Sequence, residues 1–229
     1  MMVRDKAAFF DSISDTWDAN EIKSTPEKIR KILKKISVKK GDKILDLGTG
    51  TGVLIPYFSK YVGDSGYVTG IDLSSGMLNQ AIKKFGKLPN VRFIQSDFEE
   101  NQIHGKYSLI MMYCVYPHID DPVRLFHRLI NENLEDGGRI IFAFPCDENF
   151  INNVHGEKKA EADMLPSAPV LSFGLKNAGF DVDVVDYSSE IYIVEIKGYG
   201  RANYERFMHG SLAYEANQEF PFSIGRSHF

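Results

Sequence analysis

Three glycines at alternate positions follow an apolar run that contains a single acid. In the stretch "ILDLGTGTG", residues 44–52, Asp46 precedes Gly48, Gly50 and Gly52. The three glycine positions of the loop that follows the strand carry no Cβ atoms. A ligand can therefore lie against the backbone amides and against the N-terminus of the following helix. The spacing predicts a binding site for a flat or anionic ligand.

A second acid stands at the end of the next apolar run, where Asp72 occurs in "TGIDLS". A carboxylate at this position can accept the ribose hydroxyls of a nucleotide, or it can simply cap the following helix. Two ligands fit the first interpretation: a dinucleotide, or a sulfonium compound that contains adenosine. The dinucleotide pattern is G-x-G-x-x-G, whereas here the third glycine comes one residue early. The spacing favours the sulfonium compound.

Candidate catalytic groups follow the fourth and fifth apolar runs. His118 in "VYPHIDD" is the best candidate for a general base, although it could equally be an ordinary loop histidine. His155 is a weaker candidate. Together with Cys114 and Cys146 these histidines could form a soft-metal or thiol-reactive site. No CxxC or HxxH spacing supports this, so we predict no metal site.

The elements that position these residues alternate between two patterns. Apolar runs predict strands, covered on both faces, at 42–48, 66–73, 91–97, 107–114 and 138–144. Helical periodicity lies between them at 52–61, 75–85 and 121–134, and before them at 26–37, where residues 24–27 have capping-box spacing. Repeated βαβ units predict an α/β fold with a doubly wound, mostly parallel, Rossmann-like sheet.

The last part of this region has a different pattern. After a helix near 167–178, the runs 181–188 and 190–197 alternate apolar and polar residues and are separated by a short polar turn. A hairpin requires its two strands to run antiparallel. The expected sheet therefore has seven strands and ends in an antiparallel hairpin.

Composition narrows the classes of function. The chain has 229 residues, 43% hydrophobic and 25% charged, which is enough for one domain with a full core. Its net charge is −4 and no basic stripe is interleaved with aromatic residues, so neither nucleic acid nor an anionic membrane is an expected partner. No stretch has the pattern of a signal peptide or a membrane span, which favours a cytoplasmic location.

Taken together, these motifs resemble the class I S-adenosylmethionine-dependent methyltransferases, and within them the small-molecule enzymes similar to the quinone-pathway methyltransferases. The resemblance covers about residues 5–197. It rests on "ILDLGTGTG", "VTGIDLS", "FIQSDFEE", "YSLIMMYCVYPH" and "LEDGGRIIFAF". It implies a domain over residues 1–197 with N-terminal lid helices at about 1–40. It also implies transfer of a methyl group from S-adenosylmethionine to a small organic acceptor.

The resemblance also implies roles for individual residues. The donor-binding set consists of Asp46, Gly48, Thr49, Gly50 and Gly52 for the methionine end and sugar, Asp72 with Leu73 for the ribose hydroxyls, Asp97 with Phe98 for adenine, and Cys114 for a backbone contact. Asp97 could instead be an ordinary surface carboxylate. Phe9, Phe10 and Trp17 belong either to a lid over the donor or to ordinary packing.

Other interpretations stay open. A nicotinamide-dependent oxidoreductase is disfavoured by the glycine spacing, by the lack of a second catalytic domain and by the lack of a Tyr-x-x-x-Lys pair. A non-catalytic protein that binds S-adenosylmethionine fits the same motifs. Residues 198–229 are rich in aromatic side chains and could pack on the domain, cover the acceptor site or mediate a homodimer.

Overall fold

A computed structural model describes residues 3–20, 26–155 and 164–198 of the chain. Its strands form one sheet in the order β3-β2-β1-β4-β5-β7-β6. Their bounds are β1 Lys43–Leu47, β2 Tyr67–Asp72, β3 Val91–Gln95, β4 Tyr107–Tyr113, β5 Leu134–Phe144, β6 Asp181–Tyr187 and β7 Tyr192–Lys197. Strands β1 to β5 pair in parallel, whereas β7 pairs antiparallel with β5 and β6. The predicted seven-stranded α/β sheet with a terminal hairpin is confirmed.

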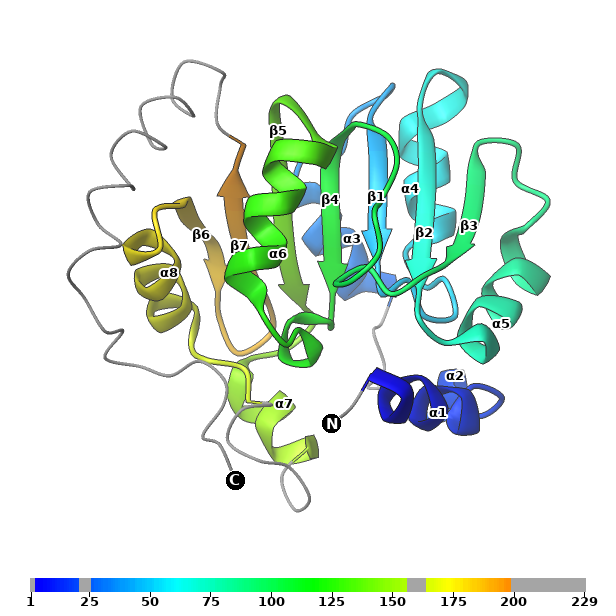
Figure 1. Cartoon of the computed structure of the whole chain (residues 1–229), viewed down its shortest axis with the longest axis horizontal. Helices are drawn as coiled ribbons and strands as arrows, with labels where there is room; N and C mark the ends of the chain where they lie inside the picture. The colour runs from blue at the N-terminus through cyan, green and yellow to red at the C-terminus, as the bar shows by residue number, and fades with distance from the viewer. Residues whose placement is uncertain (1–2, 21–25, 156–163, 199–229) are drawn as a thin grey trace.

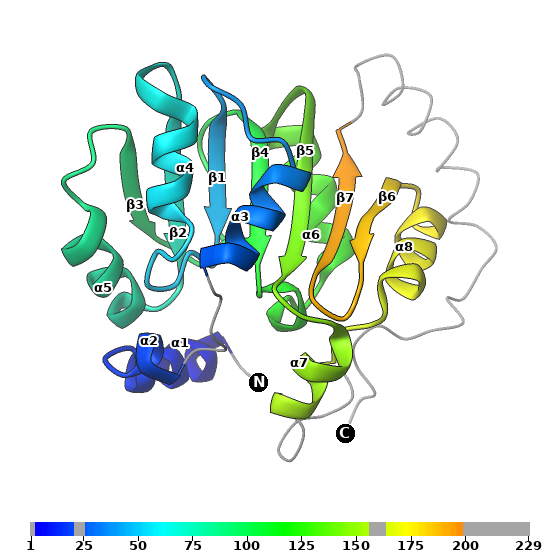
Figure 2. The ribbon, with the colours of Figure 1, turned by 180° about the vertical axis from the view of Figure 1, so that it is seen from behind.

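Helices cover both faces of the sheet (Figures 1 and 2). One face carries α3 Pro26–Lys35, α4 Ile55–Val62 and α5 Ser75–Phe85, and the other carries α6 Pro122–Arg128 and α8 Ala168–Asn177. Three further helices, α1 Val3–Ile13, α2 Trp17–Asn20 and α7 Glu148–His155, lie below the edge at which the arrowheads of β1, β2 and β4 point (Figure 1). This edge is where open α/β sheets bind their ligands.

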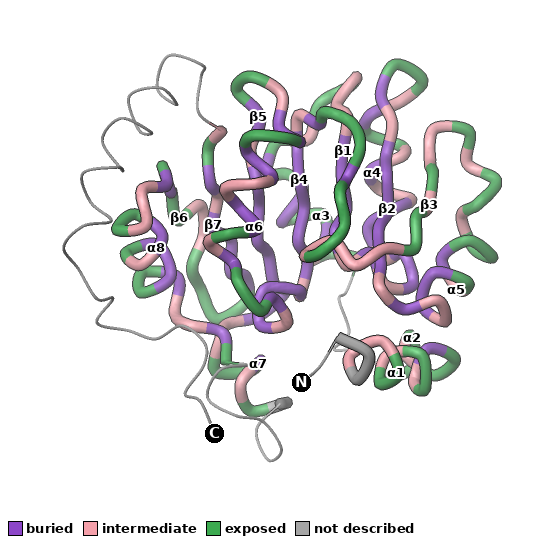
Figure 3. Tube along the Cα trace, in the orientation of Figure 1, coloured by how far each residue is buried: buried purple, intermediate pink, exposed green. Residues whose placement is uncertain are grey.

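The central strands are buried on both faces, as their apolar sequences predict. Ile44 belongs to the core cluster under α3 and α4, and its neighbour Leu45 belongs to the cluster under α6 and α8. The prediction is wrong for β3, which is an edge strand with Arg92, Ile94 and Gln95 exposed (Figure 3). An edge strand has only one neighbour, so its outer side receives less cover.

Some element boundaries differ from the sequence-based expectation. Strand β5 begins at Leu134 rather than 138, because Leu134 pairs with Tyr107 before the register shifts. Helix α6 is correspondingly short and is followed by a π-helical turn at Leu129–Asn133. Helix α4 begins at Ile55 rather than 52, after a turn that starts at Gly52 with φ +85°. Helix α7 was not predicted.

Two other expectations are met. The turn between β6 and β7 is closed by the Ser188 amide, which donates to the Ile191 carbonyl at 2.9 Å. Helix α3 begins at Pro26 as predicted, although its expected capping residues 24 and 25 lie outside the described residues. Among the helices of the described part of the chain, none is long and apolar enough to cross a membrane.

Candidate active site

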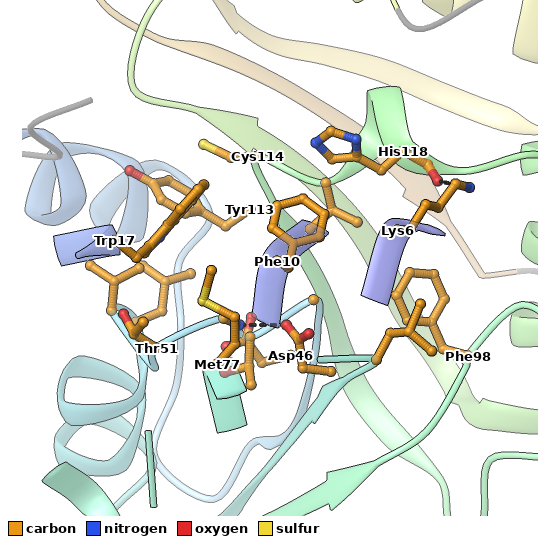
Figure 4. Close-up of a pocket in the computed structure, with 18 of the residues that line it drawn as sticks. Lys6, Phe10, Trp17, Asp46, Thr51, Met77, Phe98, Tyr113, Cys114 and His118 are labelled. Carbon is orange, nitrogen blue, oxygen red and sulfur yellow. Dashed lines mark hydrogen bonds between the residues drawn. The ribbon is translucent and has the colours of Figure 1, made fainter. Parts of the chain in front are cut away.

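A pocket lies at the carboxyl edge of the sheet, between the ends of β1, β2 and β4 and the helices α1 and α2 (Figure 4). Most of the residues predicted to bind the donor line it: Asp46, Gly48, Thr49, Gly50, Asp72, Leu73, Asp97, Phe98 and Cys114. His118 also lines it, whereas Gly52 does not. The fold therefore brings four of the five sequence motifs to one cavity, while no residue of "LEDGGRIIFAF" lines it.

The amides of the glycine loop are bonded within the protein. Thr49 donates to the Ile71 carbonyl at 2.9 Å, and Gly52 donates to the Thr49 carbonyl at 2.9 Å. The Gly50 amide donates to Oδ2 of Asp72 at 2.7 Å. These three donors are therefore not directed at an anion such as the pyrophosphate that a dinucleotide site holds on its loop amides.

The three glycines of the loop do not all serve the same structural purpose. All three have positive φ, at +67°, +55° and +85°. A Cβ atom on Gly48 would lie 2.5 Å from Val115, and one on Gly52 would lie 2.9 Å from Phe85, whereas one on Gly50 would meet nothing within 4 Å. Close packing thus excludes side chains at the outer two positions. Gly50 alone of the three faces open space, whereas Gly52 packs against Phe85 and does not line the pocket, and its contact with the donor stays a prediction.

Asp72 is buried and accepts backbone hydrogen bonds on both oxygens. Gly50 donates to Oδ2 at 2.7 Å and Ser74 donates to Oδ1 at 2.9 Å. Burial raises the pKa of this carboxyl group above its ordinary value, and the backbone hydrogen bonds oppose the shift. The cap of α5 is Ser74, whose Oγ accepts from the Met77 amide at 3.1 Å. Asp72 is therefore available for a ligand, because a carboxylate has further acceptor sites beyond two.

Asp46 is the most deeply buried acid of the pocket. Its Oδ2 accepts from the Thr49 hydroxyl at 2.7 Å. Burial raises its pKa to about 7, and the charge of Asp72 adds to this shift, while the Thr49 hydrogen bond opposes it. A cationic ligand beside Asp46 would favour the ionised form and lower this pKa.

The loop after β3 contributes Asp97 and Phe98. Oδ1 of Asp97 accepts from the Glu99 amide at 2.9 Å and from the Glu100 amide at 3.4 Å. Asp97 therefore shapes its own turn as well as lining the pocket. Its contact with adenine stays a prediction.

The loop after β4 contributes Cys114 and His118. Cys114 has φ +58°, an uncommon value for a residue with a side chain, and such outliers gather at functional sites. His118 ends a short 3₁₀ turn that begins at Tyr116. The His118 carbonyl accepts from Nζ of Lys6 at 2.8 Å, and its ring lies edge-on to Phe10 with centroids 5.5 Å apart (Figure 4).

Cys114 and His118 both line the pocket, but Cys146 does not share it with them. Cys146 is buried in the core and does not line the pocket, and burial raises the pKa of its thiol to about 11. The side chain of His155 lies outside the described residues. Within the described ranges, no group of three or more His, Cys, Asp or Glu side chains could hold a metal ion.

The sequence did not decide whether the N-terminal aromatic residues form a lid or ordinary packing, and it did not identify Lys6. In the structure Lys6, Phe10 and Trp17 all line the pocket, whereas Phe9 is 51% exposed. The Phe10 ring packs edge-on against Trp17, with centroids 5.9 Å apart. The four-residue spacing of Lys6 and Phe10, one helical turn, is the signal that could have identified this face.

The charge of the pocket is predominantly negative. Its lining contains four carboxylates, Asp46, Asp72, Asp97 and Glu99, against one lysine, Lys6. Nζ of Lys6 lies 2.8 Å from Oδ1 of Asp120, so its charge is already paired. Such a pocket favours a cationic ligand over a polyanionic one.

Known proteins that resemble this chain are methyltransferases. A family model described as a methyltransferase domain matches residues 44–138. A probable cobalt-precorrin-6B C(15)-methyltransferase of Saccharolobus solfataricus is 35% identical over 53% of this chain and 62% of its own length. A demethylmenaquinone methyltransferase of Staphylococcus aureus is 37% identical over 40% of this chain and 42% of its own length. The chain therefore spans less than two thirds of either relative.

Solved structures resemble this chain over more of its length than those two relatives do. A SAM-dependent methyltransferase from Aquifex aeolicus has a TM-score of 0.65, is 24% identical, and covers 82% of this chain and 98% of its own. Residues 44–138 thus match a methyltransferase domain, and the chain shares its fold with a solved S-adenosylmethionine-dependent methyltransferase.

Proposed function

We propose that this protein binds S-adenosylmethionine in the pocket between β1, β2, β4 and α1 and transfers its methyl group to a small organic acceptor. The observation that carries this proposal is the hydrogen bond from the Gly50 amide to Asp72. It commits the glycine loop to a carboxylate rather than to a phosphate. The acidic lining supports a donor that carries a positive sulfonium group.

The pocket offers a distinct group to each part of the donor. Asp72, with two backbone donors already bound, accepts the ribose hydroxyls. Asp46 stands nearest the charged methionine end, and Gly50 leaves room for the ligand because it has no Cβ. Asp97 and Phe98 contact the adenine ring. In this proposal residues 1–197 form the catalytic domain and the lid lies within residues 1–40.

Methyl transfer from this donor depends mainly on how the acceptor is aligned with it. When bound, S-adenosylmethionine supplies a methyl group on a sulfonium that is already a good leaving group. The protein must hold an acceptor in line with that bond and keep water out, and such positioning is worth roughly 7–11 kcal/mol of the barrier. Phe10 and Trp17 provide an apolar wall for this purpose.

An acceptor that carries a proton must lose it during transfer. His118 lies on the same cavity and is held at two points, by the Lys6 contact to its carbonyl and by the Phe10 ring. In this proposal it accepts the proton as a general base, a role typically worth 10²–10⁴-fold in rate.

The acceptor class is taken from the fold and its relatives. Those relatives are named for methylating a cobalt-precorrin and demethylmenaquinone, which differ widely, so the acceptor is defined here only as a small organic molecule. The cytoplasmic location and the homodimer stay predictions. Residues 199–229, which contain most of the proposed aromatic extension, lie outside the described residues.

The experiment is a transfer assay with methyl-labelled S-adenosylmethionine and fractionated small-molecule extracts, in which both S-adenosylhomocysteine and labelled product are measured. We expect both to appear together with at least one fraction, and neither to appear with Gly50→Val. Tight binding of the donor without turnover in any fraction would favour the non-catalytic alternative. Label transfer by the Gly50→Val variant at the wild-type rate would contradict the placement of the donor.

A further inference from the structure

Helix α1 is joined to the loop after β2 by the carboxylate of Asp11. Oδ1 of Asp11 accepts from the Ser74 hydroxyl at 2.5 Å and from the Gly76 amide at 2.8 Å. These hydrogen bonds hold the pKa of Asp11 below its ordinary value, so this carboxylate is charged at neutral pH. The contact places a charged acceptor of α1 on the first turn of α5.

Ser74 connects this contact to the donor pocket. Its amide donates to Asp72 at 2.9 Å, while its hydroxyl donates to Asp11 at 2.5 Å. The same hydroxyl accepts from the Met77 amide, which fixes its orientation. One residue is therefore shared by the carboxylate of α1 and by the carboxylate that faces the ribose in the proposed function.

The backbone is shaped for this contact. A Cβ atom on Gly76 would lie 2.6 Å from Oγ of Ser14 and 3.2 Å from Cα of Asp11. Gly76 has no positive φ, so the turn itself does not require glycine there. The close approach of α1 does. Both the charge of Asp11 and the missing side chain of Gly76 serve the same docking of α1 on α5.

We propose that Asp11 is a positioning residue for donor binding: through Ser74 it couples the docking of α1, with its pocket-lining residue Phe10, to the placement of the Asp72 carboxylate. The inference rests on the proposed function, because it takes S-adenosylmethionine as the ligand of Asp72. Coupling of this kind is reciprocal, so docking of α1 strengthens donor binding and the bound donor strengthens docking.

The chain contains its own reporter of this coupling. Trp17 is the single tryptophan of the sequence, and it lines the pocket at the start of α2. Its fluorescence emission reports directly whether the N-terminal helices cover the cavity. The test therefore measures donor affinity by calorimetry and Trp17 emission on the same full-length samples, with and without S-adenosylmethionine.

Asp11→Asn is the first variant, because Asp11 is exposed and the change keeps the side-chain size. We expect donor affinity to fall by roughly tenfold, since a charge-assisted hydrogen bond is lost. We also expect Trp17 emission in the unliganded protein to shift toward that of a solvent-exposed indole. Saturating donor should largely restore the wild-type emission.

Gly76→Ala tests the same docking without touching a charge. Alanine favours a helix over glycine by about 1 kcal/mol, so α5 itself should not be weakened. The added Cβ should nevertheless displace α1 and reproduce both effects of Asp11→Asn. Circular dichroism of each variant verifies that the domain is folded.

Asp15→Asn is the matched control. Asp15 lies between α1 and α2 and also bonds to α5, but it does so by an exposed hydrogen bond, which the Gln80 side chain donates to its Oδ1 at 2.7 Å. This variant should keep wild-type donor affinity. If Asp11→Asn and Gly76→Ala bind the donor as tightly as Asp15→Asn, the coupling is refuted. If the wild type itself fails to bind S-adenosylmethionine, the proposed function fails instead.

Discussion

The amide of Gly50 donates to the carboxylate of Asp72 at 2.7 Å, and this contact joins the loop after β1 to the end of β2. The two motifs are separated in the sequence by a full helix, α4. The pocket is therefore preorganised at the point where the donor ribose is expected, which lowers the entropic cost of binding.

The three glycines should respond differently to alanine. Gly50→Ala should cost about 1–2 kcal/mol of stability, from its positive φ alone, and should severely weaken donor binding by filling the cavity. Gly48→Ala should cost more stability, because its Cβ would overlap Val115. Denaturant unfolding and calorimetry on each variant distinguish the two classes. Equal losses of stability at both positions would contradict the packing role of Gly48, and unchanged donor affinity in Gly50→Ala would contradict the placement of the donor.

Asp72 should matter more to the donor than Asp97. Asp72→Asn removes the charged acceptor of two hydroxyls, each worth about 1.5–3 kcal/mol, while Asp97 offers one acceptor to the adenine amine. Donor dissociation constants measured for Asp72→Asn and Asp97→Asn give the comparison. The reverse order would mean that the ribose and adenine ends are misassigned.

Asp46 should make stability depend on pH in an unusual direction. Its pKa is about 7 in the folded protein against an ordinary value of 3.8, so between these values the folded state holds a proton that the unfolded state has lost. Stability therefore falls as pH rises through this window, and the penalty is complete above about pH 7.

Asp46→Asn removes this penalty. The gain in unfolding free energy should be larger at about pH 8 than at about pH 5, by roughly 2–3 kcal/mol on the scale of ~1.4 kcal/mol per pKa unit. Urea denaturation at the two pH values measures it, with Asp97→Asn as the control acid. A loss of stability in Asp46→Asn that is the same at both pH values would mean that the buried carboxyl group is charged and paired.

His118→Gln tests general-base catalysis once an acceptor is identified. Glutamine keeps hydrogen-bonding capacity and removes basicity, so the rate of the chemical step should fall by roughly 10²–10⁴ while donor affinity changes little. The limb of the pH–rate profile that reports the base should disappear. A variant that runs at the wild-type rate would reduce His118 to a packing partner of Phe10.

The topology could be predicted from the sequence because local patterns determine it. Buried strands appear in the sequence as apolar runs, and the alternation of strands and helices along the chain leaves few possible topologies. The exposure of β3 could not be read in this way, since "VRFIQ" has the apolar content of a covered strand and its edge position depends on the whole sheet. The early start of β5 likewise depends on pairing with Tyr107.

At the candidate site, too, some residues could be predicted from the sequence and others could not. The motif residues Asp46, Gly50 and Asp72 were identifiable because their spacing is local to one strand and one loop. Asp11 and Lys6 were not, because their partners Ser74 and His118 are distant in the sequence and are brought near only by the docking of α1. The packing of Gly52 against Phe85 was not identifiable either, because a packing glycine and a ligand glycine look alike in a sequence.

The central claim is that the pocket is built for a cationic adenosine donor and not for a dinucleotide. Titration calorimetry of the full-length wild-type protein with S-adenosylmethionine, S-adenosylhomocysteine and NAD tests it most directly. The account predicts saturable binding of one molecule of S-adenosylmethionine or of its demethylated product per chain, and no detectable heat with NAD. Tight binding of NAD together with no response to either sulfur compound would contradict the account.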